Sequence, residues 1–410
     1  MKKYIIIGNG VAAAGCIEGI RSVDRTGEIT VISEENHPVY CRPLISYYLE
    51  GKTDPQRMLY RSPDFYEKNG CQVLYGERAV RLCKESKQVE LADGSLHPYD
   101  ALCIAAGSTP FVPPFAGLET VSRKYSFMTL DDALALEKGI TPESRVLIVG
   151  AGLIGLKCAE GICGRVASVT VCDLAGRVLS SILDDECAAL MQRHLEQKGM
   201  EFALGDSAAR FEDGRAYMQS GRIIDFDVLV LAVGVRPNIS LIKEAGGDTG
   251  RGIVIDSCMR TSLPDIYAAG DCAEGTDASS GQQRVLAIWP NAYMQGYTAG
   301  QNMAGSHAAF DKAIPMNSIG FFGLHAMTAG SYEGDMYEEK TETSIKRLFT
   351  KDDLLKGFIL IGCKERAGIY TSMIREKTPV SSVNFELLKK TASTTAFSPD
   401  IRRKKFGGVV

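Results

Sequence analysis

The strongest constraint on the fold of this chain is a segment that occurs twice. The first copy reads KYIIIGNGVAAAGC and continues to ITVISEE, and the second reads RVLIVGAGLIGLKCAE and continues to VTVCD. In each copy an apolar run is followed by G-x-G-x-x-(A/G), a helix-forming stretch, a β-rich run and an acid. This order predicts a strand, a tight turn, a helix and a second strand. The small residues of the pattern are Gly8, Gly10 and Ala13 in the first copy and Gly150, Gly152 and Gly155 in the second.

The pattern is typical of a turn that holds the pyrophosphate of a dinucleotide. The first glycine permits the turn, the second lets the backbone approach the phosphate, and the third small residue lets helix and strand pack closely. The helix presents unpaired N–H groups and the positive end of its dipole to the anion. The acids Glu34 and Asp173 stand where a carboxylate accepts a hydrogen bond from a ribose hydroxyl. Two such units predict two different dinucleotides that exchange electrons.

The opening residues also permit another interpretation, a secretion signal that ends at Cys16. Such a signal needs an uninterrupted apolar core of about 7–15 residues. Here the run from Tyr4 to Ile7 is interrupted by Gly8-Asn9-Gly10, and these residues favour a turn. We therefore expect a strand and a turn at this place, and a cytoplasmic protein.

Composition argues against several classes of function. The net charge is −4 and no stretch interleaves basic with aromatic residues, so no nucleic-acid partner is expected. No apolar run reaches the roughly 18 residues that span a membrane, so no membrane partner is expected. The 12 cysteines include no C-x-x-C pair, so we expect no metal site. A chain of 410 residues is long enough for about two or three domains.

Further motifs carry a resemblance to a known family. LCIAAGSTP and LVLAVGVRPN each end a buried strand in a glycine turn, TSLPDIYAAGDCAEG places Asp271 after a strand and a glycine, and WPNAYMQGYTAGQNMAG suits a helix. With the two glycine turns, these motifs resemble the pyridine-nucleotide:disulfide oxidoreductases over the first 310 residues. The last hundred residues contain NSIGFFGLH, LKGFILIG and AGIYTSMIRE. They resemble the branch of NADH:rubredoxin reductases and the flavin module of NADH-dependent nitrite reductases.

The resemblance implies an α/β fold with two Rossmann-like dinucleotide-binding domains, similar to glutathione reductase, and a smaller α+β C-terminal domain. The FAD-binding domain is expected at 1–120 and 250–312, with the NAD-binding domain between them at 121–249. The C-terminal domain is expected at 313–410. The implied activity is that of an FAD-dependent NAD(P)H oxidoreductase, with FAD and NAD(H) as cofactors.

The resemblance also implies how the FAD is held. The first glycine turn would face the pyrophosphate, and the planar guanidinium of Arg42 would neutralise its charge. Glu34 would bind the adenosine ribose, and Asp271 would accept from the ribityl chain. The helix that starts near Asn291 would direct N–H groups at the flavin edge where negative charge develops on reduction. The implied FAD contacts are Gly8, Gly10, Ala13, Glu34, Glu35, Arg42, Ala106, Gly107, Asp271, Asn291 and Ala292.

At the second turn the resemblance implies NAD(H). Asp173 accepts from a ribose 2′-hydroxyl and repels a 2′-phosphate, so NADH is expected over NADPH. Arg177 is interpreted as a solvated loop residue rather than a phosphate ligand. Glu160, on the helix after the turn, is implied to reach the nicotinamide end. The implied contacts of this cofactor are Gly150, Gly152, Gly155, Asp173 and Gly234.

The redox disulfide of the family is missing. Members that reduce disulfides carry C-x-x-x-x-C on the helix after the FAD acid, whereas this chain has HPVYCRPLISYYLEG, with Cys41 alone. The pair that has this spacing, Cys158 and Cys163, lies in the second unit and is interpreted as packing. Alignment with single-cysteine members places their redox position at Pro43, two residues past Cys41. Arg42 and a helix start are nevertheless expected to favour the thiolate of Cys41.

The same stretch resembles the Y-x-R-P-P-L-S-K pattern of rubredoxin and ferredoxin reductases through Tyr40, Arg42, Pro43 and Ser46. Tyr47 stands where that pattern has a lysine beside the flavin, which argues against a mechanism that needs a cation at the flavin N5. Without a thiol relay the flavin passes electrons straight to an acceptor. We therefore expect NADH to reduce a small iron–sulfur carrier such as rubredoxin or ferredoxin. The candidate catalytic residues are Glu160, Tyr47 and Cys41.

Two alternatives stay open. One is a single-cysteine enzyme that works through Cys41, of the NADH oxidase or coenzyme-A-disulfide reductase type. The other is a flavoprotein subunit that serves in a larger redox complex or senses NADH. The basic stretch DIRRKKFGGVV at the C-terminal end is interpreted as a solvated tail, with the alternative that it steers an acidic carrier. A homodimer is also left open.

Overall fold

The computed structural model describes residues 1–212, 214–363 and 366–406, the side chains of 404–406 excepted. The chain divides into two compact units. The larger unit contains Met1–Glu274 and Trp289–Phe310, and the smaller unit contains Gly275–Ile288 and the chain from Asp311. Both copies of the repeated segment lie in the larger unit.

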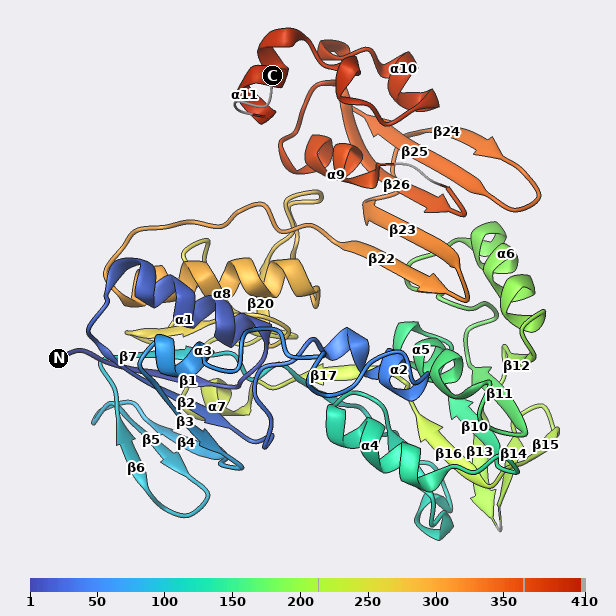
Figure 1. Ribbon diagram of the computed structural model, residues 1–410, viewed down its shortest axis with the longest axis horizontal. Coiled ribbons are helices and arrows are strands. Elements are labelled where there is room, and N and C mark those ends of the chain that lie inside the picture. The colour runs from blue at the N-terminus through green and yellow to red at the C-terminus, as the bar shows by residue number, and fades with distance from the viewer. Residues whose placement is uncertain (213, 364–365, 407–410) are drawn as a thin grey trace. The chain divides into compact units, whose positions relative to one another are not determined.

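The first copy builds a five-stranded parallel sheet (Figure 1). The opening residues KYIII form its central strand, which pairs on both sides, so the prediction of a strand there is confirmed. Helices α1 (Val11–Val23) and α8 (Trp289–Met303) lie together over this sheet. In spatial order the strands are β19 (Ile266–Ala268), β7 (Ala101–Ile104), β1 (Lys3–Ile7), β2 (Glu28–Ser33) and β3 (Cys71–Tyr75).

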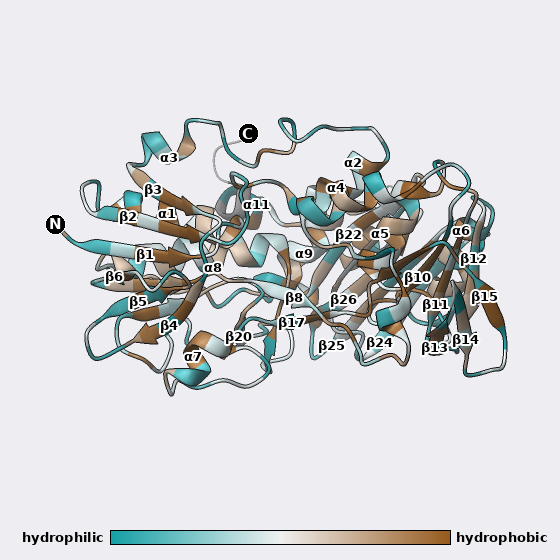
Figure 2. Cartoon of the chain, turned by 90° about the horizontal axis from the view of Figure 1, so that it is seen from below, coloured by the Kyte–Doolittle hydropathy of each residue, from teal (hydrophilic) through white to brown (hydrophobic). Residues whose placement is uncertain are grey.

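The second copy builds a matching parallel sheet, and the predicted pair of Rossmann-like sheets is thereby confirmed. Its inner strands are buried on both faces, which is why they are continuous apolar runs; Figure 2 shows these hydrophobic residues in brown along β10 and β11. In spatial order the strands are β12 (Met200–Leu204), β11 (Ser168–Asp173), β10 (Arg145–Val149), β16 (Val228–Leu231) and β9 (Lys124–Ser126). The helices of this half are α4 (Leu130–Gly139), α5 (Leu153–Ile162) and α6 (Asp185–Glu196).

Two short strands join the halves of the larger unit. β8 (Ser108–Pro110) and β17 (Val235–Pro237) pair antiparallel, and each follows the glycine turn that ends a buried strand. The other strands of this unit are β4 (Ala79–Cys83), β5 (Gln88–Leu91), β6 (Leu96–Pro98), β13 (Ala208–Glu212), β14 (Arg215–Met218), β15 (Ile223–Asp225) and β18 (Ile253–Val254). β20 (Ala273–Thr276), the partner of β18, begins in this unit and continues past Glu274. Its short helices are α2 (Ile45–Leu49), α3 (Phe65–Lys68) and α7 (Ser240–Glu244).

The smaller unit is an antiparallel sheet with helices, as the α+β prediction requires. In spatial order the sheet strands are β22 (Met316–Phe321), β23 (Leu324–Gly330), β26 (Leu354–Ile361), β25 (Ile345–Lys351) and β24 (Asp335–Lys340), with β21 (Gln283–Val285) elsewhere in the unit. The helices are α9 (Ala367–Arg375), α10 (Phe385–Lys390) and α11 (Pro399–Phe406). The predicted basic tail begins in α11, and its residues 407–410 lie outside the described residues. Within the described chain, no helix combines the length and the apolar character that a membrane span needs.

Helices α1 and α8 touch through their backbones. A Cβ atom on Gly300 would lie 2.1 Å from the carbonyl oxygen of Cys16, and one on Gly296 would lie 1.9 Å from a carbonyl of α1. Gly15 and Gly19 on α1 meet carbonyls of α8 at 2.4 and 2.1 Å in the same way. Because no side chain fits at any of these places, the four glycines fix how closely the two helices approach.

We expect Gly300→Ala to destabilise the larger unit by about 1–3 kcal/mol, because the added methyl group forces two backbones apart. The measurement is the melting temperature by differential scanning calorimetry. Gly368→Ala is the matched control, since Gly368 also lies in a helix and its Cβ would meet nothing within 4 Å. An equal effect of the two substitutions would contradict the account.

Candidate active site

The first glycine turn has the shape that a pyrophosphate requires. Gly8 has φ +105°, and a Cβ atom there would lie 2.1 Å from the carbonyl oxygen of Ala105, so this position accepts only glycine. Gly10 is the N-cap residue just before α1, and a Cβ atom on it would meet nothing within 4 Å. The backbone at the start of α1 therefore faces open space into which an anion fits.

The second glycine turn repeats this geometry. Gly150 has φ +119°, and its Cβ would lie 2.2 Å from the carbonyl oxygen of Ala232, whereas the Cβ of Gly152 would meet nothing within 4 Å. At the third position a Cβ on Gly155 would lie 1.9 Å from the carbonyl oxygen of Gly150. The first copy has the buried Ala13 at that position. Both turns thus fit a dinucleotide, and the packing at the third position is tighter in the second.

The two acids at the strand ends differ in their surroundings. Asp173 lies against the second glycine turn: one carboxylate oxygen accepts from the N–H of Ala151 at 2.6 Å and the other from Ala175 at 2.8 Å. Glu34, at the end of β2, is exposed. Arg177 lies in the loop between β11 and α6, where it forms an ion pair with Asp185 at 2.8 Å, and its side chain is 40% exposed.

Glu35 and Arg42 form one hydrogen-bonded group. Arg42 donates to a Glu35 oxygen at 2.5 Å, and the hydroxyl of Tyr40 donates to the other Glu35 oxygen at 2.6 Å. Arg42 also donates to the carbonyl of Met128 at 2.9 Å, and Tyr40 accepts from the N–H of Leu130 at 2.9 Å. Glu35 therefore orients Arg42, and the group ties the first half of the larger unit to the second.

Asp271 lies near this group. Burial raises the pKa of its carboxyl group, and the positive charge of Arg42 opposes that rise. The preceding Gly270 donates its N–H to the side-chain oxygen of Gln295 on α8 at 2.9 Å. Asn291 and Ala292, in the first turn of α8, are both buried. The structure thus places Asp271 near Arg42 and next to α8.

The turns that end the two buried strands are connected to each other. The side chain of Asn238 donates to the carbonyl of Ala106 at 2.8 Å, and its N–H donates to Gly107 at 3.0 Å. Gly234 accepts from the N–H of Phe111 at 2.9 Å. Asn238 is not among the residues predicted from the sequence. It ends the motif LVLAVGVRPN, which corresponds to LCIAAGSTP in the first half, and this correspondence could have indicated it.

The prediction of a favoured Cys41 thiolate is wrong. Burial raises the pKa of this half-buried thiol, and the hydrogen bond from the N–H of Leu44 opposes the rise only in part. The neighbouring Arg42 donates to Glu35. The pKa of Cys41 is set by burial and by the N–H of Leu44. Burial likewise raises the pKa of Cys158, which is fully buried, and of Cys163.

Glu160 and Tyr47 are both contacted by Lys157. Lys157 forms an ion pair with Glu160 on the same helix, and its ammonium lies 4.7 Å from the centre of the Tyr47 ring. Glu160 and Tyr47 are predicted from the sequence as catalytic residues, whereas Lys157 is not. The signal was the i, i+3 spacing of Lys157 and Glu160 on α5.

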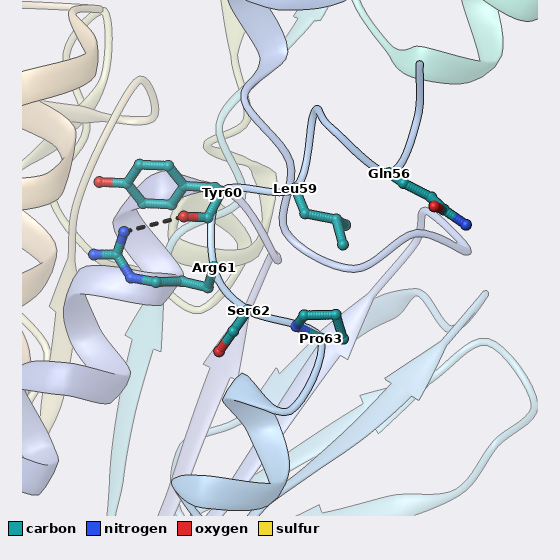
Figure 3. Close-up of a pocket in the computed structure, with 6 residues that line it drawn as sticks. All are labelled: Gln56, Leu59, Tyr60, Arg61, Ser62 and Pro63. Atoms are coloured by element: carbon teal, nitrogen blue, oxygen red, sulfur yellow. Dashed lines mark hydrogen bonds between the residues drawn. The ribbon is translucent and has the colours of Figure 1, made fainter. Parts of the chain in front are cut away.

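The structure also has an open surface hollow of about 810 Å³. It is lined by Gln56, Leu59, Tyr60, Arg61, Ser62 and Pro63 (Figure 3). The guanidinium of Arg61 lies over the Tyr60 ring at 4.1 Å and pairs with Glu18 of α1 at 2.6 Å. Tyr60 contacts Trp289, the first residue of α8, edge to face at 5.2 Å. These contacts anchor the loop to α1 and α8, and none of the lining residues is a predicted cofactor contact.

Comparison with known proteins agrees with this geometry. Residues 2–296 match the model of the pyridine nucleotide-disulphide oxidoreductase family. The chain is 32% identical over 394 residues to the NADH-dependent phenylglyoxylate dehydrogenase subunit epsilon of Aromatoleum evansii, covering 92% of this chain and 93% of that protein. It is 33% identical over 276 residues to a probable ferredoxin reductase of Castellaniella defragrans, covering 66% and 67%.

The fold is also found among solved structures. The crystal structure of the covalent putidaredoxin reductase–putidaredoxin complex superimposes with a TM-score of 0.87 at 24% identity, over 96% of this chain and 99% of that one. The glycine turns supply the space and the helix N-termini that FAD and NAD(H) need. The chain therefore belongs to the pyridine nucleotide-disulphide oxidoreductase family and is an NAD(H)-dependent flavin oxidoreductase.

Proposed function

We propose that this protein oxidises NADH and passes the electrons through FAD directly to a small iron–sulfur carrier, with no thiol relay. The observation that carries the proposal is the state of Cys41. It is the sole cysteine in HPVYCRPLISYYLEG, and burial raises the pKa of its thiol. A relay needs a thiolate, because the thiolate is the nucleophile, and burial opposes the formation of a thiolate at Cys41.

The proposed residue roles follow the two turns. The turn at Gly8 and Gly10, with Arg42 beside it, holds the FAD pyrophosphate, and Asp271 accepts from the ribityl chain. The turn at Gly150 and Gly152 holds the pyrophosphate of NADH. We propose the predicted boundaries with these roles: 1–120 and 250–312 for FAD, 121–249 for NAD(H) and 313–410 for the C-terminal domain. Within the FAD segment, Gly275–Ile288 packs with the smaller unit.

The chemistry divides between cofactor and protein. When bound, FAD would accept two electrons as a hydride and release them singly or in pairs. One NADH yields NAD⁺, one proton and two electrons, so one NADH reduces about two molecules of a one-electron carrier. The chain positions the two cofactors: Arg42 and Asn238 connect the halves of the larger unit that carry the two turns.

A second candidate function follows from the relative in Aromatoleum evansii. That protein is named as a subunit of an NADH-dependent dehydrogenase, and this chain matches 93% of its length. In this alternative the acceptor is another subunit of a larger complex rather than a free carrier. Both candidates share the first step, the reduction of bound FAD by NADH, and differ in the step after it.

The experiment that separates the candidates is stopped-flow spectroscopy. The FAD-bound protein is reduced with NADH and then mixed with rubredoxin, ferredoxin or oxygen. Fast reoxidation by an iron–sulfur carrier supports the first candidate. Fast reduction by NADH with slow reoxidation by every acceptor supports the second. Failure of NADH to reduce the flavin would contradict both.

Substitution of the two open glycines tests which cofactor each turn holds. We expect Gly10→Glu to abolish FAD binding, because its side chain and charge occupy the space of the pyrophosphate. We expect the matched Gly152→Glu to retain FAD and to lose reduction by NADH. The measurements are the flavin absorbance of the purified protein and its bleaching by NADH. Loss of FAD in Gly152→Glu alone would reverse the assignment.

The preference for NADH is expected to depend on Asp173. Replacing it with alanine should narrow the ratio of kcat/KM for NADH over NADPH by about tenfold or more, since a hydrogen bond to a charged acceptor contributes about 1.5–3 kcal/mol. Because Asp173 also holds the N–H of Ala151, Asp173→Asn serves as the control that retains an acceptor oxygen at the turn. Equal efficiency with both cofactors in the unmodified protein would contradict the role.

Reductive titration tests the absence of a thiol relay. We expect the protein to take up about two electrons per chain, and Cys41→Ser to retain most NADH-dependent dye reduction, because electrons leave the flavin directly. Cys163→Ser is the control for a second half-buried thiol. An uptake of about four electrons that falls to about two in Cys41→Ser would instead support a single-cysteine enzyme.

A further inference from the structure

Lys157 is a mostly buried cation on the helix that follows the second glycine turn. Its side chain is 13% exposed, and that of its ion-pair partner Glu160 is 5% exposed. The ammonium lies 4.7 Å from the centre of the Tyr47 ring, within the range of a cation–π interaction. A cation held in this way is weakly screened by solvent, so its field acts strongly on neighbouring groups.

The position of this cluster is set by the contact between α2 and α5. A Cβ atom on Gly161 would lie 3.0 Å from both the carbonyl oxygen of Ser46 and the Cβ of Leu49. The two helices therefore pack without an intervening side chain at this point. Tyr47 lies on the stretch that follows Arg42, and Lys157 lies five residues after Gly152. The cluster thus connects α2, in the first dinucleotide half, to α5, the helix that starts at the second glycine turn.

Hydride transfer places a geometric demand on the same region. The nicotinamide and flavin rings must approach to about 3–3.5 Å for the transfer, so they must meet between the two halves of the larger unit. Of the contacts described between α2 and α5, the cluster of Tyr47, Lys157 and Glu160 is the one that carries a buried cation. The flavin gains negative charge when it is reduced, and a fixed cation stabilises such charge.

We propose, as an extension of the proposed function, that Lys157 supplies the positive charge at the place where nicotinamide and flavin meet. Glu160 positions the ammonium through the ion pair, and Tyr47 positions it through the cation–π contact. Position 47, on α2, has a tyrosine instead of a lysine, and Lys157 of α5 supplies the cation in its place. This replaces the expectation, drawn from Tyr47 alone, that the site works without a cation there.

A neighbouring lysine provides the matched control. Lys52 also approaches the Tyr47 ring, at 5.7 Å, and pairs with Glu50, but its side chain is 60% exposed. Solvent screens such a charge. If burial and position on α5 are what matter, removal of the Lys52 charge leaves the electronic properties of the flavin unchanged.

The test uses the FAD-bound protein and two equilibrium measurements. Sulfite adds to the flavin and leaves negative charge on the ring, so its dissociation constant reports the charge nearby; the midpoint potential of the flavin reports the same field. We expect Lys157→Gln to weaken sulfite binding by about tenfold or more and to lower the potential. We expect Lys52→Gln to change neither, and Tyr47→Lys combined with Lys157→Gln to restore both, because it returns an ammonium from the opposite helix.

Lys157→Gln leaves Glu160 buried without its cation, which can prevent folding. If that variant does not retain FAD, Lys157→Gln combined with Glu160→Gln is measured in its place; because it removes both charges of the ion pair, a smaller weakening in the same direction is expected. Sulfite affinity equal to that of the unmodified protein in the folded variant, or an equal loss in Lys52→Gln, would overturn the proposal. Reduction of the unmodified flavin by NADH is recorded in parallel, so failure of the proposed function is seen separately from failure of the role of Lys157.

Discussion

The backbone contact between α1 and α8 is the constraint on which the first dinucleotide site depends. Gly15 and Gly19 on one helix and Gly296 and Gly300 on the other bring the two backbones together with no side chain between them. Because α1 starts at the first glycine turn and α8 starts near the polar residues of the flavin half, this contact fixes two helix N-termini relative to each other. The positive ends of both helix dipoles favour an anion, so their fixed arrangement suits an anionic cofactor.

The two halves of the larger unit share a construction and are then linked by polar contacts. In both halves the N–H of the turn glycine donates to the second strand of the unit, β2 or β11. The same glycine lies against the carbonyl that follows a third strand, Ala105 for Gly8 and Ala232 for Gly150. The links are the strands β8 and β17, the side chain of Asn238, and the group around Arg42. Electron transfer between two cofactors requires that their sites keep a fixed separation, and these links provide it.

The site illustrates how neighbours decide the chemistry of a residue. Cys41 follows a tyrosine and precedes an arginine in the sequence, which suggests a stabilised thiolate; in the fold the arginine turns to Glu35, and burial raises the pKa of the thiol. Tyr47 suggests the loss of a cation, yet Lys157 from a helix over a hundred residues later lies on its ring. In both cases the deciding partner comes from the tertiary structure, so no local pattern could show it.

The sequence by itself determined the two parallel sheets, the glycine turns and the acids beside them. These are local consequences: a buried strand must be apolar, a left-handed turn and a close backbone approach need glycine, and both requirements appear in consecutive residues. Only the tertiary structure decided what Glu35 binds, that α1 and α8 touch, and that Lys157 lies between Tyr47 and Glu160. These contacts join segments that are far apart in the chain. A local sequence pattern therefore does not show them.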